Sequence, residues 1–404
     1  MLLRMAWRNV WRNQRRTLIT LSTLTFGVMA IVFTESFQSS FYQQLQELIT
    51  SGLLGHLQVH GAGYQNEPDI ATVVRDPLDI EAKIKGAVPG ATTERRVLGY
   101  ALAGAGDTSS AALVLGVEPE REASAPLFTI HKGRDLGAGP ARSAVLGTEM
   151  AATQGATVGG EVILLGQAAD GSVANDRYTV VGIGDAGSAE MNSSAVLLSL
   201  ADAQDFFALG NGVHQILVRL PSEQDDLTAP LNAVRGAVDV KTNEVLSWSQ
   251  MLPEMKGTME AKKRSVHIVD FVVFLIVGLG VLNTMTMATF ERTHELGVLA
   301  SLGTRRSSLL GLILTEALIQ GVIGFVLGLA IAVPLLHAVS GAGFAGMSGT
   351  DILGVRFPSS ITVHVVGASV ASAAFTALST VLVGALWPAI RASRLSPVQA
   401  TRYA

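Results

Sequence analysis

Residues 271–290 read FVVFLIVGLGVLNTMTMATF, a run of apolar and small side chains without a single charge. Three further windows are equally free of charge, at residues 17–34, 317–350 and 357–390. A helix needs about 20 mostly apolar residues to cross a bilayer, because backbone groups without a hydrogen-bond partner are costly in lipid. We therefore expect four membrane helices, at residues 17–38, 266–290, 307–336 and 361–387.

The overall composition supports this interpretation. Of the 404 residues, 49% are hydrophobic and 15% are charged, and the mean hydropathy is +0.40, whereas a soluble protein carries about 25% charged residues. The alternative, a set of buried helices in a large soluble protein, is disfavoured by four such windows in one chain. The absence of cysteine excludes a disulfide framework, a thiolate metal site and a cysteine nucleophile.

Basic residues predict the orientation of the four segments, because the cytoplasmic loops of membrane proteins are rich in Lys and Arg. Arginines gather at residues 1–16, 291–306 and 388–404. The loop 337–360 holds only Arg356. We expect both termini and the second membrane loop in the cytoplasm of a bacterial inner membrane, and residues 39–265 on the periplasmic side. The basic group Lys262–Arg264 opposes this orientation, but long translocated domains largely escape the charge rule.

Residues 39–265 differ in charge from the rest of the chain. They contain 17 Lys+Arg and 27 Asp+Glu, a balance of −10, whereas the rest contains 12 and 6, a balance of +6. Their alternating patterns predict a large mixed α/β domain with stalks, inserted between the first and second membrane helices, and their length suggests two subdomains, the inserted one at about residues 116–212. Strand-like runs lie at 56–60, 112–117 and 215–220, and helical runs at 78–85, 200–208 and 246–264.

The N-terminal segment 1–16 plots as a two-faced helix. Leu3, Trp7, Val10 and Trp11 fall on one arc, and the adjoining arc holds Arg4, Arg8, Arg12 and Arg15. This pattern favours a helix on the cytoplasmic leaflet, with indoles at headgroup depth and arginines near anionic lipid. The alternative is an ordinary basic flank of a membrane helix. A cleaved signal peptide is a second alternative, but no clear small-residue cleavage site follows at residues 35–39.

Motifs of catalysis and nucleotide binding are not found in the sequence. Gly182, Gly184 and Gly187 form a Gly-x-Gly-x-x-Gly run, which we interpret as a glycine loop at a strand end because the helix and acid of a dinucleotide site do not follow. A phosphate-cradling Gly-x-x-x-x-Gly-Lys-Ser/Thr, a His-Glu-x-x-His and a Gly-x-Ser-x-Gly are all absent. His56 and His60 share a strand face, where a surface pair is favoured over metal ligands. We expect no enzymatic activity, no metal site and no nucleic-acid partner for this chain.

Polar residues within the third membrane segment are candidates for packing or mechanism. Glu316 and Gln320 lie one turn apart, and a carboxylate at membrane depth is costly enough to suggest a function. Structural pairing and a mechanistic role are equally open at this point. Gly324 and Gly328 have the spacing that allows close helix packing.

The cytoplasmic loop 291–303 reads ERTHELGVLASLG, and the tail 388–400 reads PAIRASRLSPVQA. The loop resembles the E-R-x-x-E-[IL]-G-x-x-x-[AS]-[LI]-G segment of the MacB/FtsX-type ABC transporter permeases, and the tail resembles their closing P-x-x-x-A-x-R-x-x-P-x-x-A element. His294 and Ala300 depart from positions where that family often has basic residues. The outer domain is similar to the family's periplasmic core in five short segments, in the expected order: 115–117, 132–134, 145–147, 158–160 and 181–183.

The resemblance implies a function by mechanotransmission. A separate cytoplasmic ATPase dimer, which would bind ATP and Mg, is expected to push the loop, and a second permease chain, identical or related, is expected to complete the assembly. No cofactor is expected in this chain. The ATPase-coupling candidates implied by the motif are Glu291, Arg292, Glu295, Leu296, Gly297, Leu299, Leu302 and Gly303.

The residues of the loop agree with a docking role. Leu296, Leu299 and Leu302 recur at three-residue spacing, with Val298 alongside, which predicts a short helix with one apolar face that can enter a groove of a soluble partner. The alternative is a connector that lies on the membrane.

Four functions remain open within and beyond the family. The segment 55–59 (GHLQV) and the free-standing format resemble the lipoprotein-releasing branch of LolC/LolE type, which implies extraction of lipoprotein cargo. The alternatives are an efflux or peptide-export permease with a periplasmic adaptor, a signal relay that activates a periplasmic hydrolase, and a membrane-anchored scaffold without an ATPase.

Overall fold

The computed structural model describes residues 2–50, 54–106, 108–122, 127–137, 141–221, 226–340, 351–352, 355–356 and 362–394. These residues form two compact units. The first consists of residues 1–43, 258–344 and 360–404, and the second of residues 44–257 and 345–359.

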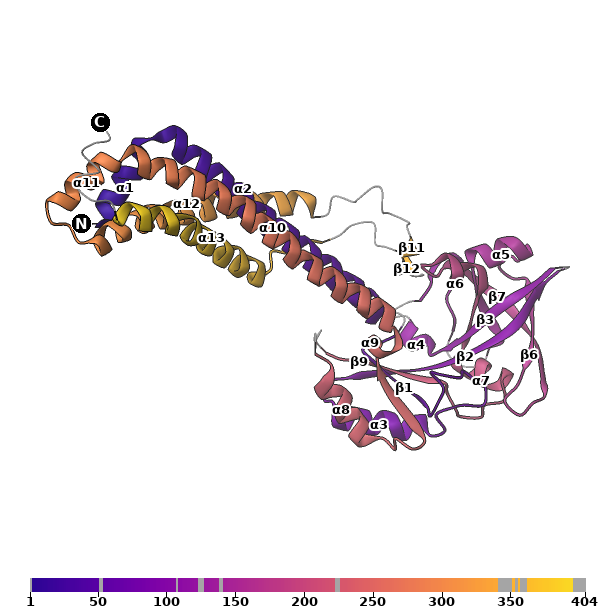
Figure 1. Ribbon diagram of the computed structural model, residues 1–404. Helices are drawn as coiled ribbons and strands as arrows, with labels where there is room; N and C mark the ends of the chain where they lie inside the picture. Colours follow the sequence, from indigo (N-terminus) through magenta and orange to yellow (C-terminus); the bar gives the residue numbers. More distant parts are fainter. Residues whose placement is uncertain are drawn as a thin grey trace. The chain divides into compact units, whose positions relative to one another are not determined.

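The first unit is a bundle of four long apolar helices with two short ones (Figure 1). The long helices are α2 (Gln14–Leu48), α10 (Pro253–Glu291), α12 (Arg306–Val339) and α13 (Gly367–Ser393), and each is long and apolar enough to cross a membrane. The short helices are α1 (Leu2–Arg12) and α11 (Thr293–Ser301). Four candidate membrane helices are thus confirmed. The fourth begins at Gly367 and not at 361, since residues 362–366 are not helical.

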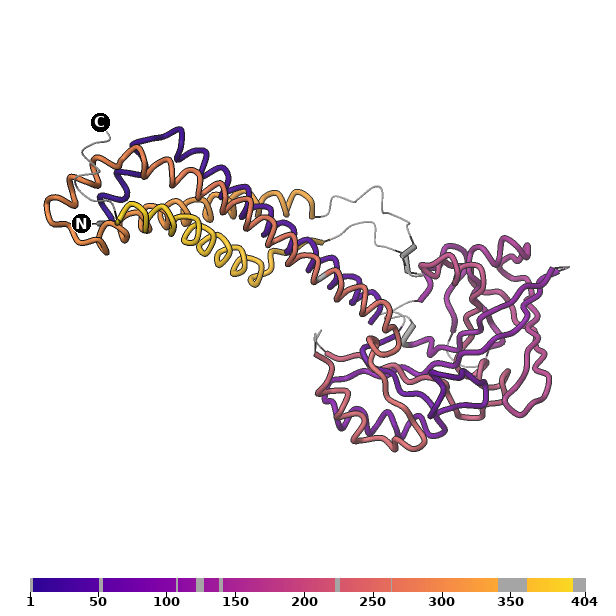
Figure 2. Tube along the Cα trace, viewed as in Figure 1, coloured from indigo at the N-terminus to yellow at the C-terminus, as the bar shows by residue number. Residues whose placement is uncertain are grey.

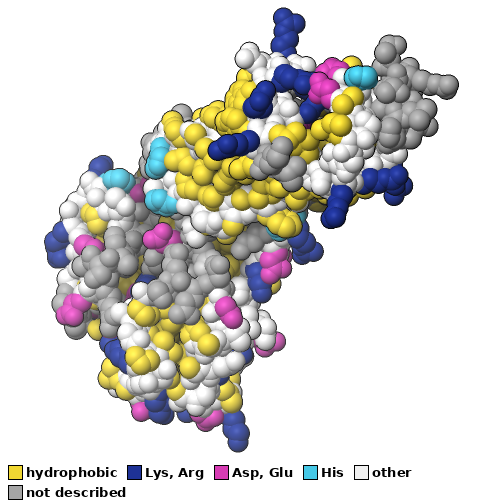
Figure 3. Space-filling view, turned by 90° about the vertical axis from the view of Figure 1, so that its left-hand side faces the viewer, with side chains coloured by type: hydrophobic (Ala, Val, Ile, Leu, Met, Phe, Trp, Pro, Cys, Tyr) yellow, Lys and Arg dark blue, Asp and Glu magenta, His cyan; other side chains and the backbone are white. Residues whose placement is uncertain are grey.

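Small residues set the packing of the bundle. A Cβ atom added at Gly324 would lie 2.6 Å from Cβ of Leu24, and one added at Gly328 would lie 2.7 Å from Cβ of Val28. These two glycines of α12 therefore bring α2 into close contact, as their spacing predicted. Helix α13 likewise buries Ala377 and Ala385. Outward-facing residues are large and apolar, and hydrophobic side chains gather over the upper part of Figure 3, where the long helices lie.

The second unit is a mixed α/β domain. Its strands are β1 (Leu57–Gly61), β2 (Thr92–Ala105), β3 (Thr108–Val117), β4 (Thr129–Gly133), β5 (Ser143–Gly147), β6 (Glu161–Gln167), β7 (Val173–Asp185), β8 (Ala195–Ser199), β9 (Gln215–Arg219) and β10 (Asn243–Ser247). Its helices are α3 (Pro77–Ala87), α4 (Pro119–Glu122), α5 (Thr148–Gln154), α6 (Ala189–Ser194), α7 (Leu200–Phe206), α8 (Thr228–Ala237) and α9 (Trp248–Met251). A hairpin of β11 (Asp351–Ile352) and β12 (Val355–Arg356) also belongs to this unit.

The strands follow the order β10-β1-β9-β2-β3-β8-β5-β7-β4, with β6 paired to β2 and β7. The pairs β3–β8 and β5–β7 are parallel and the other pairs of this sheet are antiparallel, so the sheet is mixed. Residues 92–96 of β2 pair with β9, and residues 97–105 pair with β3. Strand β2 therefore belongs to both halves of the sheet.

Two expectations about this domain are wrong in detail. His56 and His60 are buried, with 6% and 1% exposure, and do not form a surface pair. The reason is that other residues of the domain cover both rings: His60 stacks on Tyr64 at 5.2 Å between ring centres, and Nδ1 of His56 accepts a hydrogen bond from the backbone NH of Leu220. Residues 246–247 end strand β10 and are not helical, so that the helical run begins only at Trp248.

The interpretation of the glycine run as a strand end is confirmed. Gly182 and Gly184 lie within β7, and a Cβ atom added at Gly182 would lie 2.3 Å from the carbonyl oxygen of Arg134. Gly187 follows in a left-handed conformation, with a φ of +74°. These glycines allow a close backbone approach and a turn, which are structural roles.

Candidate functional site

Helix α11 is a short connection between the two long helices α10 and α12. Arg292 interrupts the helical backbone between α10 and α11, and Gly303, with a φ of +86°, turns the chain after α11. Glycine is favoured at a left-handed position because glycine has no Cβ atom. Figures 1 and 2 show α11 at the end of the bundle where α1 and the last turns of α13 also lie.

The apolar residues of α11 divide between two faces. Leu296 is 4% exposed and packs, together with Leu299, into a cluster with α12 and α13. Gly297 is also buried. Leu302, in contrast, is 78% exposed, and Val298 is 41% exposed. The predicted single apolar face is therefore wrong: the helix ends at Ser301, so Leu302 lies beyond the helical spacing that aligns Leu296 with Leu299.

Three ion pairs that join different elements stabilise the polar side of this region, and a fourth, between Arg292 and Glu295, lies at the start of α11. Nη1 of Arg12 lies 2.8 Å from Oε1 of Glu295, and Arg16 pairs with Glu291. The bond between Arg12 and Glu295 raises the pKa of the Arg12 guanidinium and lowers the pKa of the Glu295 carboxyl. Both members of this pair are about half exposed, so its contribution to stability is small, about 0.2–1 kcal/mol.

The third ion pair is buried and joins three elements. Nη1 of Arg292 donates to both carboxylate oxygens of Glu316, at 2.9 and 3.0 Å, and Nδ2 of Asn9 donates to the same carboxylate at 2.6 Å. The Arg292 and Glu316 side chains are only 15% and 8% exposed. Glu316 of α12 therefore contacts both α1 and the start of α11, so structural pairing is observed for this residue. Gln320 lies buried one turn further along α12.

The sequence did not identify Asn9 as a partner of Glu316 or Arg16 as a partner of Glu291. Each has its partner more than 270 residues away along the chain. The only local signal was that Arg16 continues the arginine series of the N-terminal segment.

A hollow of about 360 Å³ lies beside α11, between the ends of α10 and α13. Its walls include Thr289, Phe290, His294 and Trp387. The guanidinium of Arg391 lies 5.0 Å from the Phe290 ring centre and 5.3 Å from the Trp387 ring centre, which is cation–π distance. The hollow thus lies at the start of α11, where Glu291, His294 and Arg391 belong to its walls.

The N-terminal helix α1 packs on α12 through its small apolar residues. Ala6 and Val10 are buried, so Val10 does not belong to the exposed arc on which its spacing placed it. Trp7 and Trp11 are 50% and 41% exposed, and their rings meet edge to face at 6.0 Å. Arg4, Arg8 and Arg12 are exposed as well. The candidate membrane-surface residues thus keep much of their surface exposed, although Arg12 pairs with Glu295.

Two family models account for most of the chain. The MacB-like periplasmic core domain matches residues 17–232, and the FtsX-like permease C-terminal domain matches residues 268–397. The chain belongs to the MacB/FtsX family of ABC transporter permeases. In this MacB/FtsX permease the ion-paired region around α11 lies within the FtsX-like match, apart from its contacts from α1 and α2.

Relatives of the permease differ in how much of their length is shared. The lipoprotein-releasing system transmembrane protein LolC of Neisseria meningitidis serogroup B is 23% identical over 408 residues, 96% of this chain and 94% of LolC. The pyoverdine export ATP-binding/permease protein PvdT of Pseudomonas aeruginosa is 29% identical over 209 residues, 52% of this chain, and the match spans only 26% of PvdT. The crystal structure of the periplasmic region of MacB from Actinobacillus actinomycetemcomitans shares 13% identity over 54% of this chain and 98% of that region, with a TM-score of 0.38.

Among the described residues, no group of three or more His, Asp or Glu side chains is arranged to hold a metal ion. The candidate functional site thus consists of exposed surfaces, ion pairs and the ends of long helices.

Proposed function

We propose that this permease receives the ATP-driven motion of a separate cytoplasmic ATPase at α11. The observation that carries the proposal is the division of α11 into two sides. Leu296 and the Arg292–Glu316 pair fix its inner side, while Val298 and Leu302 stay exposed. ATP and Mg would be bound by the partner, and two permease chains would serve one pair of ATPases.

The contacts provide a route for a push on α11. A short helix fixed by a buried ion pair moves as a rigid body with the elements it holds. Through Glu316 it would move α12, and the pair of Arg16 and Glu291 joins α2 to the end of α10. Helix α2 ends at Leu48 and helix α10 begins at Pro253, and both of these residues belong to the second unit. Each of the two helices is therefore continuous from the bundle to residues of that unit.

Coupling is tested by purification of the full chain with a co-expressed candidate ABC ATPase. Val298→Asp and Leu302→Asp place charges on the exposed side of α11, and burial of such side chains at an interface is worth about 1.5–3 kcal/mol each. We expect ATPase association about tenfold weaker or worse, with loss of stimulated ATP hydrolysis. Val240→Asp, at a 61% exposed position in the second unit, is the matched control. Unchanged coupling in the α11 variants would contradict the proposal.

We further propose that the cargo is an acylated protein, released from the inner membrane. LolC is matched over almost its whole length. The second unit also exposes an apolar sheet face, where Tyr100 is 78% exposed and Leu102 of β2 lies opposite Leu165 of β6. Contiguous exposed apolar surface marks an interaction site. An efflux permease with a periplasmic adaptor is the alternative, supported by the match to PvdT.

Photo-crosslinking distinguishes the two cargo hypotheses. Crosslinkers at Tyr100 and Leu165 should trap acylated proteins, whereas a crosslinker at the exposed Lys85 of α3 should not. Adaptor alone in the traps would favour efflux, and a cell-wall hydrolase alone would favour a signal relay. His56 and Gln58 are unsuitable crosslinking positions because both are buried.

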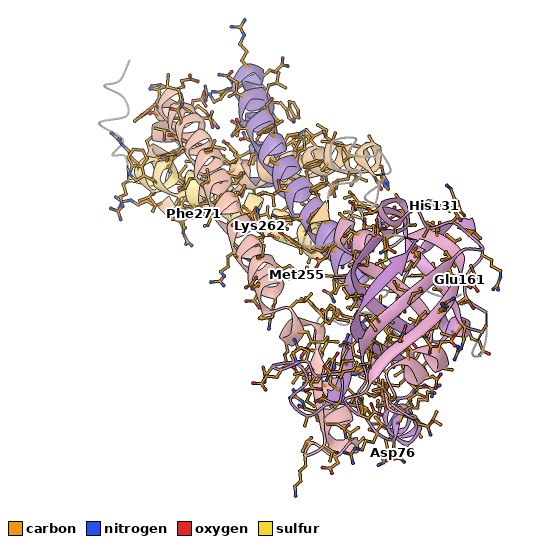
Figure 4. All side chains as sticks on the ribbon, turned by 90° about the vertical axis from the view of Figure 1, so that its right-hand side faces the viewer. Asp76, His131, Glu161, Met255, Lys262 and Phe271 are labelled. Atoms are coloured by element: carbon orange, nitrogen blue, oxygen red, sulfur yellow. The ribbon has the colours of Figure 1, made fainter. Side chains whose placement is uncertain are left out.

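The proposed orientation places both termini in the cytoplasm. The opposing basic group around Lys262 lies on α10 between Met255 and Phe271 (Figure 4). At 1.5 Å per residue, Lys262 is about 13 Å from Phe271 along the helix, which is where the charge-free run begins. The basic group then belongs to a stalk outside the bilayer. A reporter fused after Ala404 should be cytoplasmic, and periplasmic activity of that reporter would overturn the topology.

A further inference from the structure

A large apolar hollow separates parts of α1 and α12. It measures about 810 Å³, within the range of about 300–1,000 Å³ that is usual for small-ligand sites. From α12 it is lined by Thr315, Leu318, Ile319, Val322 and Ile323. From α1 it is lined by Leu3, Arg4, Trp7 and Arg8.

The hollow arises from the way α1 packs. Ala6 and Val10 contact the bundle and are buried. Leu3 and Trp7 project beside that contact and are 66% and 50% exposed. On the opposite wall Val322 is 51% exposed. Thr315, the one hydroxyl of the wall, donates to the carbonyl oxygen of Gly311. The hollow therefore offers mainly apolar surface, and the side chains of its lining that have a hydrogen-bond donor to spare are the two arginines and the indole of Trp7.

The rim of the hollow is cationic. Arg4 and Arg8 are exposed, lie one turn apart on α1, and form no ion pair with the part of the chain that the structure describes. Helix α1 contains no acid, and its third arginine, Arg12, is already paired with Glu295. Two guanidinium groups beside an apolar hollow match a ligand with an anionic head and a hydrocarbon tail.

We propose that this hollow binds one anionic phospholipid, with an acyl chain against α12 and the phosphate at Arg4 and Arg8. A second copy of this chain would bring apolar side chains but, from its membrane helices, few anions for the two arginines. The bound lipid would hold α1 on α12, where Arg12 reaches Glu295 and Asn9 reaches Glu316. Lipid charge would thereby influence the position of α11. Only this last consequence rests on the proposed function, because lipid binding itself needs no ATPase.

The test uses the full chain in phosphatidylcholine vesicles that contain a minor fraction of brominated lipid, which quenches tryptophan fluorescence on contact. Trp11→Phe and Trp387→Phe leave Trp7 as the tryptophan at the hollow. We expect brominated phosphatidylglycerol to quench Trp7 more strongly than brominated phosphatidylcholine, with a binding preference of about fivefold for each arginine. The preference should disappear in Arg4→Gln/Arg8→Gln and persist in the control Arg15→Gln.

A second variant separates the acyl site from general attraction to a charged surface. Val322→Phe fills the hollow without a change of charge, so it should reduce quenching by phosphatidylglycerol while Arg15→Gln does not. Equal quenching by both lipids in the parent chain, or a preference unchanged in Arg4→Gln/Arg8→Gln, would overturn the proposal. Absence of quenching by either lipid would also overturn it, since protein would then cover the hollow. Size-exclusion profiles and circular dichroism identify variants that fail to fold.

Discussion

Replacement of Glu316 by Gln is the most direct test of the cluster that holds α11. The change keeps the size of the side chain and one acceptor oxygen, but removes the negative charge. Arg292 then loses a carboxylate to which it donates at 2.9 and 3.0 Å, and Asn9 loses an ionised acceptor at 2.6 Å. We expect α11 to open more often while the rest of the bundle stays folded.

The magnitude follows from burial and from the remaining contacts. Loss of one partner of a buried ion pair costs about 3–5 kcal/mol, and a hydrogen bond to a charged group contributes about 1.5–3 kcal/mol. Arg292 keeps a second carboxylate, because its Nε lies 3.5 Å from Glu295. We therefore expect a cost of about 2–3 kcal/mol, which corresponds to about 30- to 160-fold in an opening equilibrium.

Hydrogen exchange of the full-length chain measures that equilibrium. Amides of α11 should lose protection by the stated factor in Glu316→Gln, whereas amides of β3 and β8 should not change. Glu161→Gln is the control, since Glu161 and Arg177 form an exposed pair at 3.5 Å that is worth less than about 1 kcal/mol. Protection of α11 within about threefold of the parent chain would refute the role of Glu316. An equal loss throughout α12 would indicate general unfolding of the bundle.

Four further substitutions test helix packing, the pH response and a helix cap by calorimetry. Gly328→Ala should destabilise the bundle by about 1–3 kcal/mol, because the new methyl group would lie 2.7 Å from a side chain of α2. The control is Gly311→Ala, where no atom lies within 4 Å of the new methyl group. This change should be neutral or should stabilise the bundle by up to about 1 kcal/mol. Burial lowers the pKa of His60 to about 4. Below about pH 6.5 the folded domain therefore binds fewer protons than the unfolded chain. The free energy of unfolding should fall as the pH falls from about 6.5 towards 4, by about 3 kcal/mol for this group. His60→Phe should remove that part of the acid sensitivity, and an unchanged pH profile would contradict the assignment. Ser199→Ala removes the hydroxyl that accepts from the backbone NH of Asp202 at the start of α7, at a cost of about 1 kcal/mol.

The membrane helices could be predicted because their signal is local and strong. Lipid excludes charge, so a charge-free run such as 271–290 is visible in the sequence without knowledge of what packs against it. Glycine spacing on α12 was equally informative, since small residues permit close approach on any neighbour. What spacing could not supply was the identity of the neighbour, which is α2.

Burial of individual side chains was less predictable. His56 and His60 have the spacing of one strand face, but both are buried, because Tyr64 stacks on the His60 ring and the backbone of Leu220 contacts His56. Val10 lies on the apolar arc of α1 together with two exposed tryptophans, yet it is buried because α12 covers that part of the arc. The predicted alignment of Leu302 with Leu296 requires α11 to continue past Ser301, but the helix ends at Ser301. In each case a contact distant in sequence, or the end of an element, decided the outcome.

The ion pairs give the arginines of this permease a second role beside orientation. Arg12, Arg16 and Arg292 were read as markers of the cytoplasmic side, and all three are paired with glutamates. This does not weaken the orientation argument, because the rule counts Lys and Arg and is not a rule of net charge. It does separate the arginines by function. Arg12 and Arg292 link α11 and its start to α1 and α12, and Arg16 links α2 to the end of α10, whereas Arg4 and Arg8 are the arginines that we propose to contact lipid. A substitution in the first group should therefore change the coupling to the ATPase, and a substitution in the second group should change the response to lipid charge.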